Sequence, residues 1–157
     1  MPKGWRQGGL LIVASLLSAC ATGPRFSAVE PPPDSHALVY IYREHGVFGL
    51  AMRPDIWVDG QQVGDLPAGG YLRVEVPLAS GPRRVFVGGR RCSPLRSRAE
   101  APGAIHLTPG STFYVQLDIE TGSQAQGERY VWNNSCRLQV AEPGKALAAL
   151  AKLKLAS

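Results

Sequence analysis

The three cysteines of this chain have the strongest covalent chemistry, and they lie in two different settings. Cys20 ends an apolar run that begins at Leu10, whereas Cys92 and Cys136 lie far downstream in polar surroundings. A thiol can be acylated, paired in a disulfide or bound to a metal. No CxxC or histidine-rich spacing accompanies Cys92 or Cys136, so we predict no metal site there.

Paired carboxylates and histidines would offer a route to catalysis. Asp118 and Glu120 are two residues apart on one face of a predicted strand, where two carboxylates could act as acid and base in a cell-wall hydrolase. Solvated surface charge is the competing interpretation. His36, His45 and His106 fit no HExxH or HxH spacing, and the GxSxG and GxxxxGKS motifs do not occur. We therefore predict a protein that is not an enzyme, with no catalytic residue, metal or cofactor.

The first nineteen residues are typical of a secretory signal peptide. Lys3 and Arg6 precede the apolar run, and the small residues Ser18 and Ala19 follow it. The run is about half the length that a membrane span needs. Cleavage before Cys20 would lower the formal charge from +5 to +3. The pI of about 9.4 could suggest nucleic acid, but the export signal argues against it, so we predict no nucleic-acid partner.

Cys20 stands where the cleavage is expected. The tetrad Leu17-Ser18-Ala19-Cys20 resembles the lipobox of bacterial lipoproteins, in which the cysteine sulfur receives a diacylglycerol and the new amino terminus is acylated, for example by palmitate. The alternative is a signal peptide whose cysteine is incidental. Position 21, directly after the cysteine, is alanine and not aspartate, which resembles the signal for export to the outer membrane. We therefore predict that the lipid anchor lies in the outer membrane and that the domain faces the periplasm. Residues 20–35, with three consecutive prolines, would form an extended tether.

Residues 36–157 are predicted to form one domain. Apolar and polar residues alternate with a period of two along much of it, which is the pattern of β-strands. Alternation over 37–44, 71–76, 83–89 and 111–120 predicts strands, and further strands are expected at 129–133 and 136–140, with 121–128 as a flexible turn. Asp59-Gly60 predicts a type I′ hairpin turn. These signals favour a mainly β fold, an antiparallel β-sandwich with a short C-terminal helix that begins near Pro143.

Cys92 and Cys136 would both pass an oxidising export step. An even pair in an exported domain is usually a disulfide, so we predict that bond. Two separate free thiols are the alternative.

The order of four segments is similar to that of a known bacterial family. ALVYIYRE, IWVDGQQVGDLPAGGY, HLTPGSTFYVQL and EPGKALAAL, spread over roughly residues 36 to 150, resemble the lipoprotein domain of unknown function number twenty-eight forty-six. The VDGQQVG hairpin is also similar to PEGA-type β-domains, which are small surface-associated sandwiches. The resemblance implies a fold and an envelope location but no established activity.

Aromatic side chains alternate with the expected core positions and give a candidate binding surface. If exposed, they could stack on sugar rings or fill a pocket at a protein interface. The alternative is that the C-terminal helix covers one such face and buries several rings. The surface comprises Tyr40, Tyr42, Trp57, Tyr71, Tyr114 and Trp132. We therefore expect a membrane-anchored, non-catalytic interaction or structural module with an envelope protein or glycan, such as peptidoglycan, as partner.

Overall fold

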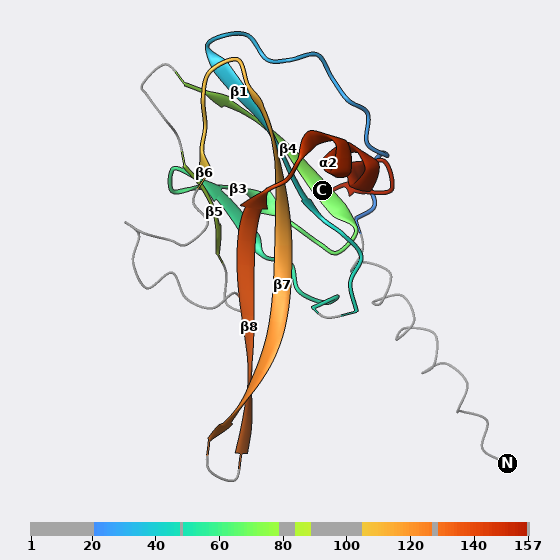
Figure 1. The fold of residues 1–157 in the computed structure, drawn as a ribbon, viewed down its shortest axis with the longest axis vertical. Helices are drawn as coiled ribbons and strands as arrows, with labels where there is room; N and C mark the ends of the chain where they lie inside the picture. The colour runs from blue at the N-terminus through green and yellow to red at the C-terminus, as the bar shows by residue number, and fades with distance from the viewer. Residues whose placement is uncertain (1–20, 48, 79–83, 89–104, 127–128, 157) are drawn as a thin grey trace, which may run out of the picture.

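The structure is a computed structural model that describes residues 21–47, 49–78, 84–88, 105–126 and 129–156. It is mainly β, with one short helix near the C-terminus (Figure 1). The elements are β1 His36–Arg43, β2 Asp55–Val58, β3 Gln61–Asp65, β4 Gly70–Pro77, β5 Arg84–Gly88, β6 Ile105–His106, β7 Thr112–Gln126, β8 Arg129–Val140, α2 Pro143–Leu150 and β9 Lys154–Leu155.

The larger sheet has five strands in the order β8-β7-β1-β4-β9. β1 pairs antiparallel with β4, and β7 pairs antiparallel with β8. However, β1 pairs parallel with β7, and β4 pairs parallel with β9. The prediction of purely antiparallel pairing is therefore wrong. The long connection between β1 and β7 includes the second sheet, which gives the chain room to return and start β7 at the same end as β1.

The second sheet has the order β3-β2-β5-β6 and contains the predicted hairpin. Asp59 and Gly60 have φ angles of 48° and 84°, the positive values that a type I′ turn requires, so this prediction is confirmed. The two sheets share one hydrophobic core. Ile56 and Val85 from the smaller sheet join Val39, Ile41 and Val115 from the larger one, all fully buried.

β7 and β8 form a long β-ribbon, which we define as residues 118–126 paired with residues 129–137. Figure 1 shows the ribbon projecting well beyond the rest of the domain. The predicted turn over 121–128 is wrong, because β7 continues to Gln126 and pairs with Arg129. The two strands expected at 129–133 and 136–140 are one strand. Backbone pairing across the ribbon outweighs the weak strand propensity of its Gly, Ser and Gln residues.

α2 packs against the opposite face of the larger sheet from the shared core. Pro143 begins the helix as predicted, and the carboxylate of Glu142 accepts hydrogen bonds from the backbone N–H groups of Gly144 and Lys145. Ala146 and Leu150 are buried, whereas Leu147 is exposed. The helix ends at Leu150 because the chain then turns to pair β9 with β4.

The segment after the predicted anchor is held against this domain. Gly23 N–H donates to the carbonyl of Leu155 at 3.1 Å, and Leu155 N–H donates to the carbonyl of Pro24 at 2.8 Å. Ala21 is only 7% exposed. Residues 21–26, predicted as part of an extended tether, therefore pack against the domain; the exposed Pro31 and Pro33 lie further along the same segment.

Candidate functional site

Cys20, the predicted lipidation site, lies outside the described residues, but its neighbour Ala21 fixes where the chain enters the domain. A methyl group built on Gly70 would lie 3.1 Å from the Cβ of Ala21, so these two residues are in contact. Gly70 is the first residue of β4 and pairs with Arg43 at the end of β1. Ala21 is therefore next to one defined end of the larger sheet.

Phe26 fixes the same segment from its other end. Its ring meets Tyr40 edge-on at a centroid distance of 5.2 Å and Tyr71 at 5.6 Å. Tyr40 also stacks on Tyr114 at 5.7 Å with an interplanar angle of 8°. The four rings and the apolar face of α2, with Ala146 and Leu150, form the second core of the domain, which we call the tyrosine core.

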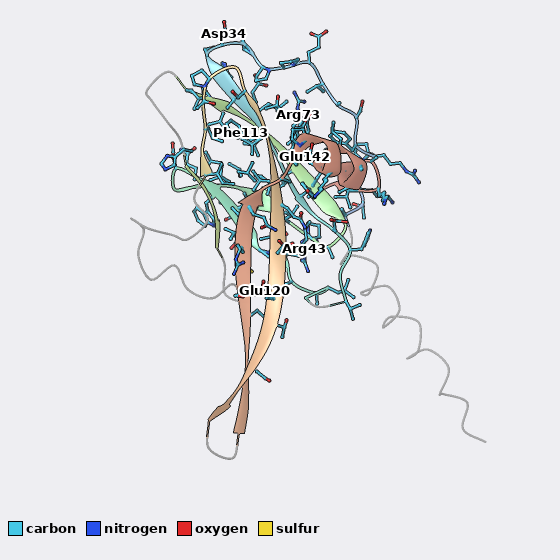
Figure 2. All side chains as sticks on the ribbon, viewed as in Figure 1. Asp34, Arg43, Arg73, Phe113, Glu120 and Glu142 are labelled. Atoms are coloured by element: carbon cyan, nitrogen blue, oxygen red, sulfur yellow. The ribbon has the colours of Figure 1, made fainter. Side chains whose placement is uncertain are left out.

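The tyrosine core changes the interpretation of the candidate binding surface. Tyr40, Tyr42 and Tyr71 are buried, with Tyr40 only 2% exposed, and Tyr114 is half-buried against them. These rings are not an exposed stacking surface, because α2 and residues 21–26 cover them, as the alternative interpretation expected. Arg73, on the same face of β4 as Tyr71, is exposed because it lies beyond this cover (Figure 2).

The two tryptophans of the candidate surface lie elsewhere. Trp57 is half-buried in β2 of the second sheet, where it pairs with Phe86. Trp132 pairs with Ser123 in the ribbon. The six aromatic residues are therefore distributed over both sheets and the ribbon, and they do not form one surface.

Only one of the two cysteines of the predicted disulfide lies among the described residues. Cys136 is half-buried in β8 opposite Ile119 and packs against the shared core. Cys92 lies outside the described residues, as does most of the arginine-rich stretch around it. The bond between Cys92 and Cys136 stays a prediction.

Asp118 is held by neutral amide groups. Gln116 Nε2 donates to Asp118 Oδ1 at 2.9 Å, and Gln139 Nε2 donates to Oδ2. The Tyr42 hydroxyl donates to Gln116 Oε1 at 3.3 Å, and burial, followed by the charges of Glu44 and Asp118, raises the pKa of Tyr42. Glu120 is exposed and lies opposite Ser135 (Figure 2). The hydrogen bonds from Gln116 and Gln139 hold the Asp118 carboxylate in place on the larger sheet.

Arg43 was not singled out from the sequence, yet it organises the end of β1. Its side chain is buried, and Nη1 and Nη2 donate to the carbonyls of Met52 at 2.8 Å and Gly49 at 2.6 Å. Burial lowers the pKa of the guanidinium, but Arg remains charged at physiological pH. A lone Arg at the end of a strand is the only sequence signal, and most such residues are exposed.

Two open cavities of about 370 and 310 Å³ lie along the second half of β4. One side of the larger cavity is formed by residues 29–33, which include the three consecutive prolines. Its lining consists of Val29, Glu30, Pro31, Pro32, Pro33, Leu38, Arg73 and Glu75. Among the described residues, no group of His, Cys, Asp or Glu could hold a metal ion. Within the same part of the chain, no helix is long and apolar enough to cross a membrane.

No known protein-family model, curated protein or solved structure matches the chain. The resemblance to the lipoprotein domain family therefore stays a prediction.

Proposed function

We propose that the protein is a non-catalytic envelope lipoprotein, anchored in the outer membrane through acyl chains on Cys20 and facing the periplasm. The observation that carries this proposal is the tetrad Leu17-Ser18-Ala19-Cys20 at the end of a signal-like apolar run. The close packing of the chain from Ala21 onward supports it, because the domain begins directly after the proposed attachment site. Two or more acyl chains are needed for stable attachment.

The proposed role is that of an interaction or structural module. Its proposed architecture is a β-sandwich, supported by the single core that both sheets share. A glycan-binding role is less favoured than a protein partner, because three of the six aromatic residues proposed for it are buried. A hydrolase role is less favoured still, because both carboxylate oxygens of Asp118 accept bonds from amide groups of neighbouring glutamines.

The proposal is tested by the intact mass of the protein extracted from its native membrane and by fractionation of Cys20→Ala. We expect a mass equal to residues 20–157 plus a diacylglyceryl and an acyl group. Cys20→Ala should leave the membrane fraction, while the control Ser27→Ala, an exposed position in the same segment, should remain in it. An unmodified thiol on Cys20 in the extracted protein would refute the anchor.

A further inference from the structure

Two apolar side chains near the end of β1 project into solvent. Val47 is 84% exposed and Leu50 is 47% exposed. They are two of the five large apolar side chains that are exposed among the described residues, and Val47 is the most exposed of them. We call Val47 and Leu50 the apolar tip. Strongly exposed apolar side chains can mark a contact with a partner or a membrane.

The turn that carries Leu50 is held in place by the buried side chain of Arg43. Arg43 donates to the carbonyls of Gly49 and Met52, and Met52 N–H donates to the Gly49 carbonyl at 2.8 Å. Gly49 has a φ of 69°, and a methyl group built on it would lie 3.2 to 3.3 Å from Arg43, Met52 and Ile119. The chain from Gly49 to Met52 is therefore fixed against the base of the ribbon, so Leu50 is presented by a built turn.

The residue that follows the attachment position lies at the same end of the domain. Ala21 contacts Gly70, and Gly70 pairs with Arg43, the residue that fixes the turn carrying Leu50. The ring of His45 lies against Gly69 and joins the two regions. Cys20 is one residue before Ala21, and consecutive Cα atoms are about 3.8 Å apart. Acyl chains on Cys20 would thus begin within one residue of this end.

We propose that the apolar tip inserts into the bilayer that holds the anchor, so that this end of the domain rests on the membrane surface. The inference rests on the proposed function, because only a lipidated Cys20 brings this end to a membrane. The occupant of the apolar tip is a lipid surface, since the anchor and the exposed side chains share one end and residues 21–26 leave no slack between them. Interfacial side chains reach about 5–10 Å into a bilayer.

The ribbon determines how the domain lies on the membrane. It leaves the sheet at the end where Arg43 lies, because β7 runs parallel to β1 and continues past it (Figure 1). Residues 118–126, at about 3.4 Å per residue, extend about 30 Å further. Their Asp, Glu, Thr, Ser and Gln residues are too polar for the acyl region. The ribbon therefore lies along the headgroups, and the domain is tilted on the bilayer.

The test uses tryptophan as a depth probe in the full lipidated protein. Trp5 is removed with the signal peptide, so Trp57→Phe and Trp132→Phe leave a mature chain without tryptophan. A single tryptophan is then introduced by Val47→Trp or, as a matched control, by Val29→Trp. Val29 is also exposed, at 42%, but it lies beside Leu38, five residues and about 17 Å along β1 from Arg43. Figure 2 shows Asp34 and Arg43 at opposite ends of this part of the domain.

Both variants are reconstituted into phosphatidylethanolamine and phosphatidylglycerol vesicles with brominated acyl chains, and quenching of fluorescence is measured. We expect quenching at least about threefold stronger at position 47 than at position 29, because only the former enters the brominated layer. Equal or absent quenching in protein that floats with the vesicles would overturn this inference and leave the proposed function intact. A protein that carries no lipid by mass and does not float would refute both.

Discussion

The ring of Phe26 stands edge-on to the ring of Tyr40, with 5.2 Å between centroids and 76° between planes. Phe26 belongs to the segment predicted as an extended tether, and Tyr40 belongs to a strand of the domain. Their contact makes Phe26 part of the tyrosine core, together with Ala146 and Leu150 of α2. The segment that follows Cys20 is thereby coupled to the stability of the domain, and the first prediction concerns that coupling.

Gly23→Ala should detach the first residues of the segment. An added methyl group would collide with the carbonyl oxygen of Leu155 and approach its Cβ to 2.9 Å. We expect the free energy of unfolding to fall by about 1–3 kcal/mol, the usual effect of overpacking a close contact. Urea denaturation measures this, and faster proteolytic cleavage within residues 21–26 reports the detachment. Ser27→Ala, at an exposed position, is the control; an equal loss in both variants would contradict the prediction.

Tyr40→Phe and Tyr42→Phe should have opposite effects on stability. The Tyr40 hydroxyl is buried and finds no hydrogen-bond partner among the residues that the structure describes, whereas the Tyr42 hydroxyl donates to Gln116. Removing an unsatisfied hydroxyl should leave the free energy of unfolding unchanged or raise it by up to about 1 kcal/mol. Tyr42→Phe should lower it by about 0.5–1 kcal/mol. Thermal and urea unfolding of both variants decide the matter, and a clear loss in Tyr40→Phe would show that its hydroxyl is bonded.

The sequence predicted the local features of this fold, such as turns and helix starts, better than it predicted which strands pair with one another. The Asp59-Gly60 turn and the start of α2 at Pro143 are set by the backbone preferences of two or three residues, so they could be predicted. The parallel pairing of β1 with β7 depends on how the chain returns through the second sheet, which no local pattern encodes. Lys154 and Leu155 favour a helix by propensity, yet they form β9 because Gly70 and Tyr71 offer a strand edge.

Of the candidate site, the sequence alone predicts only the lipidation of Cys20, which stays a prediction because Cys20 lies outside the described residues. The spacing around Cys20 indicates lipidation from the residue types alone, but the positions of Arg43, Val47 and Leu50 depend on how the chain turns after β1. Tyr40, Tyr42 and Tyr71 were placed on the correct face of the larger sheet. Whether that face is covered depends on contacts between the two ends of the chain, such as those of Phe26 with Tyr40 and Tyr71.

Arg43→Met should destabilise the domain and loosen the turn that carries Leu50. The variant leaves the carbonyls of Gly49 and Met52 without the two guanidinium donors. We expect the free energy of unfolding to fall by about 2–4 kcal/mol, because the lost hydrogen bonds are charged and buried. The matched control is Arg53→Met, which breaks a largely exposed ion pair with Asp65 and should change stability by less than about 1 kcal/mol. Similar losses in the two variants would show that burial of Arg43 contributes nothing.

The tyrosine core should make the domain sensitive to alkali. Burial raises the pKa of Tyr42, Tyr71 and Tyr114, with the nearby Tyr40 adding to the effect for the last two. Unfolded tyrosines ionise near pH 10, so above about pH 10 the folded protein binds more protons than the unfolded one. The contribution of these tyrosines to stability should be constant below that pH and fall as pH rises through the raised values. Urea denaturation across this range measures the slope, which Tyr114→Phe should reduce; a flat profile would contradict the prediction.

The cap of α2 should act at the acid end of the pH range. Glu142 accepts from Gly144 N–H at 3.0 Å and from Lys145 N–H at 3.1 Å, and these backbone bonds lower the pKa of its carboxyl below 4.5. Because the folded pKa is the lower one, the stabilisation is complete above about pH 4.5 and is lost as pH falls through the folded value. Glu142→Gln should lower Tm at neutral pH and remove this part of the acid dependence, since a neutral amide is the weaker acceptor at a helix N-terminus. Glu120→Gln is the control, because Glu120 is exposed in the ribbon and caps no helix. Thermal unfolding at about pH 3 and pH 7 compares the variants, and an unchanged difference between the two conditions in Glu142→Gln would show that the acid sensitivity of the domain arises elsewhere.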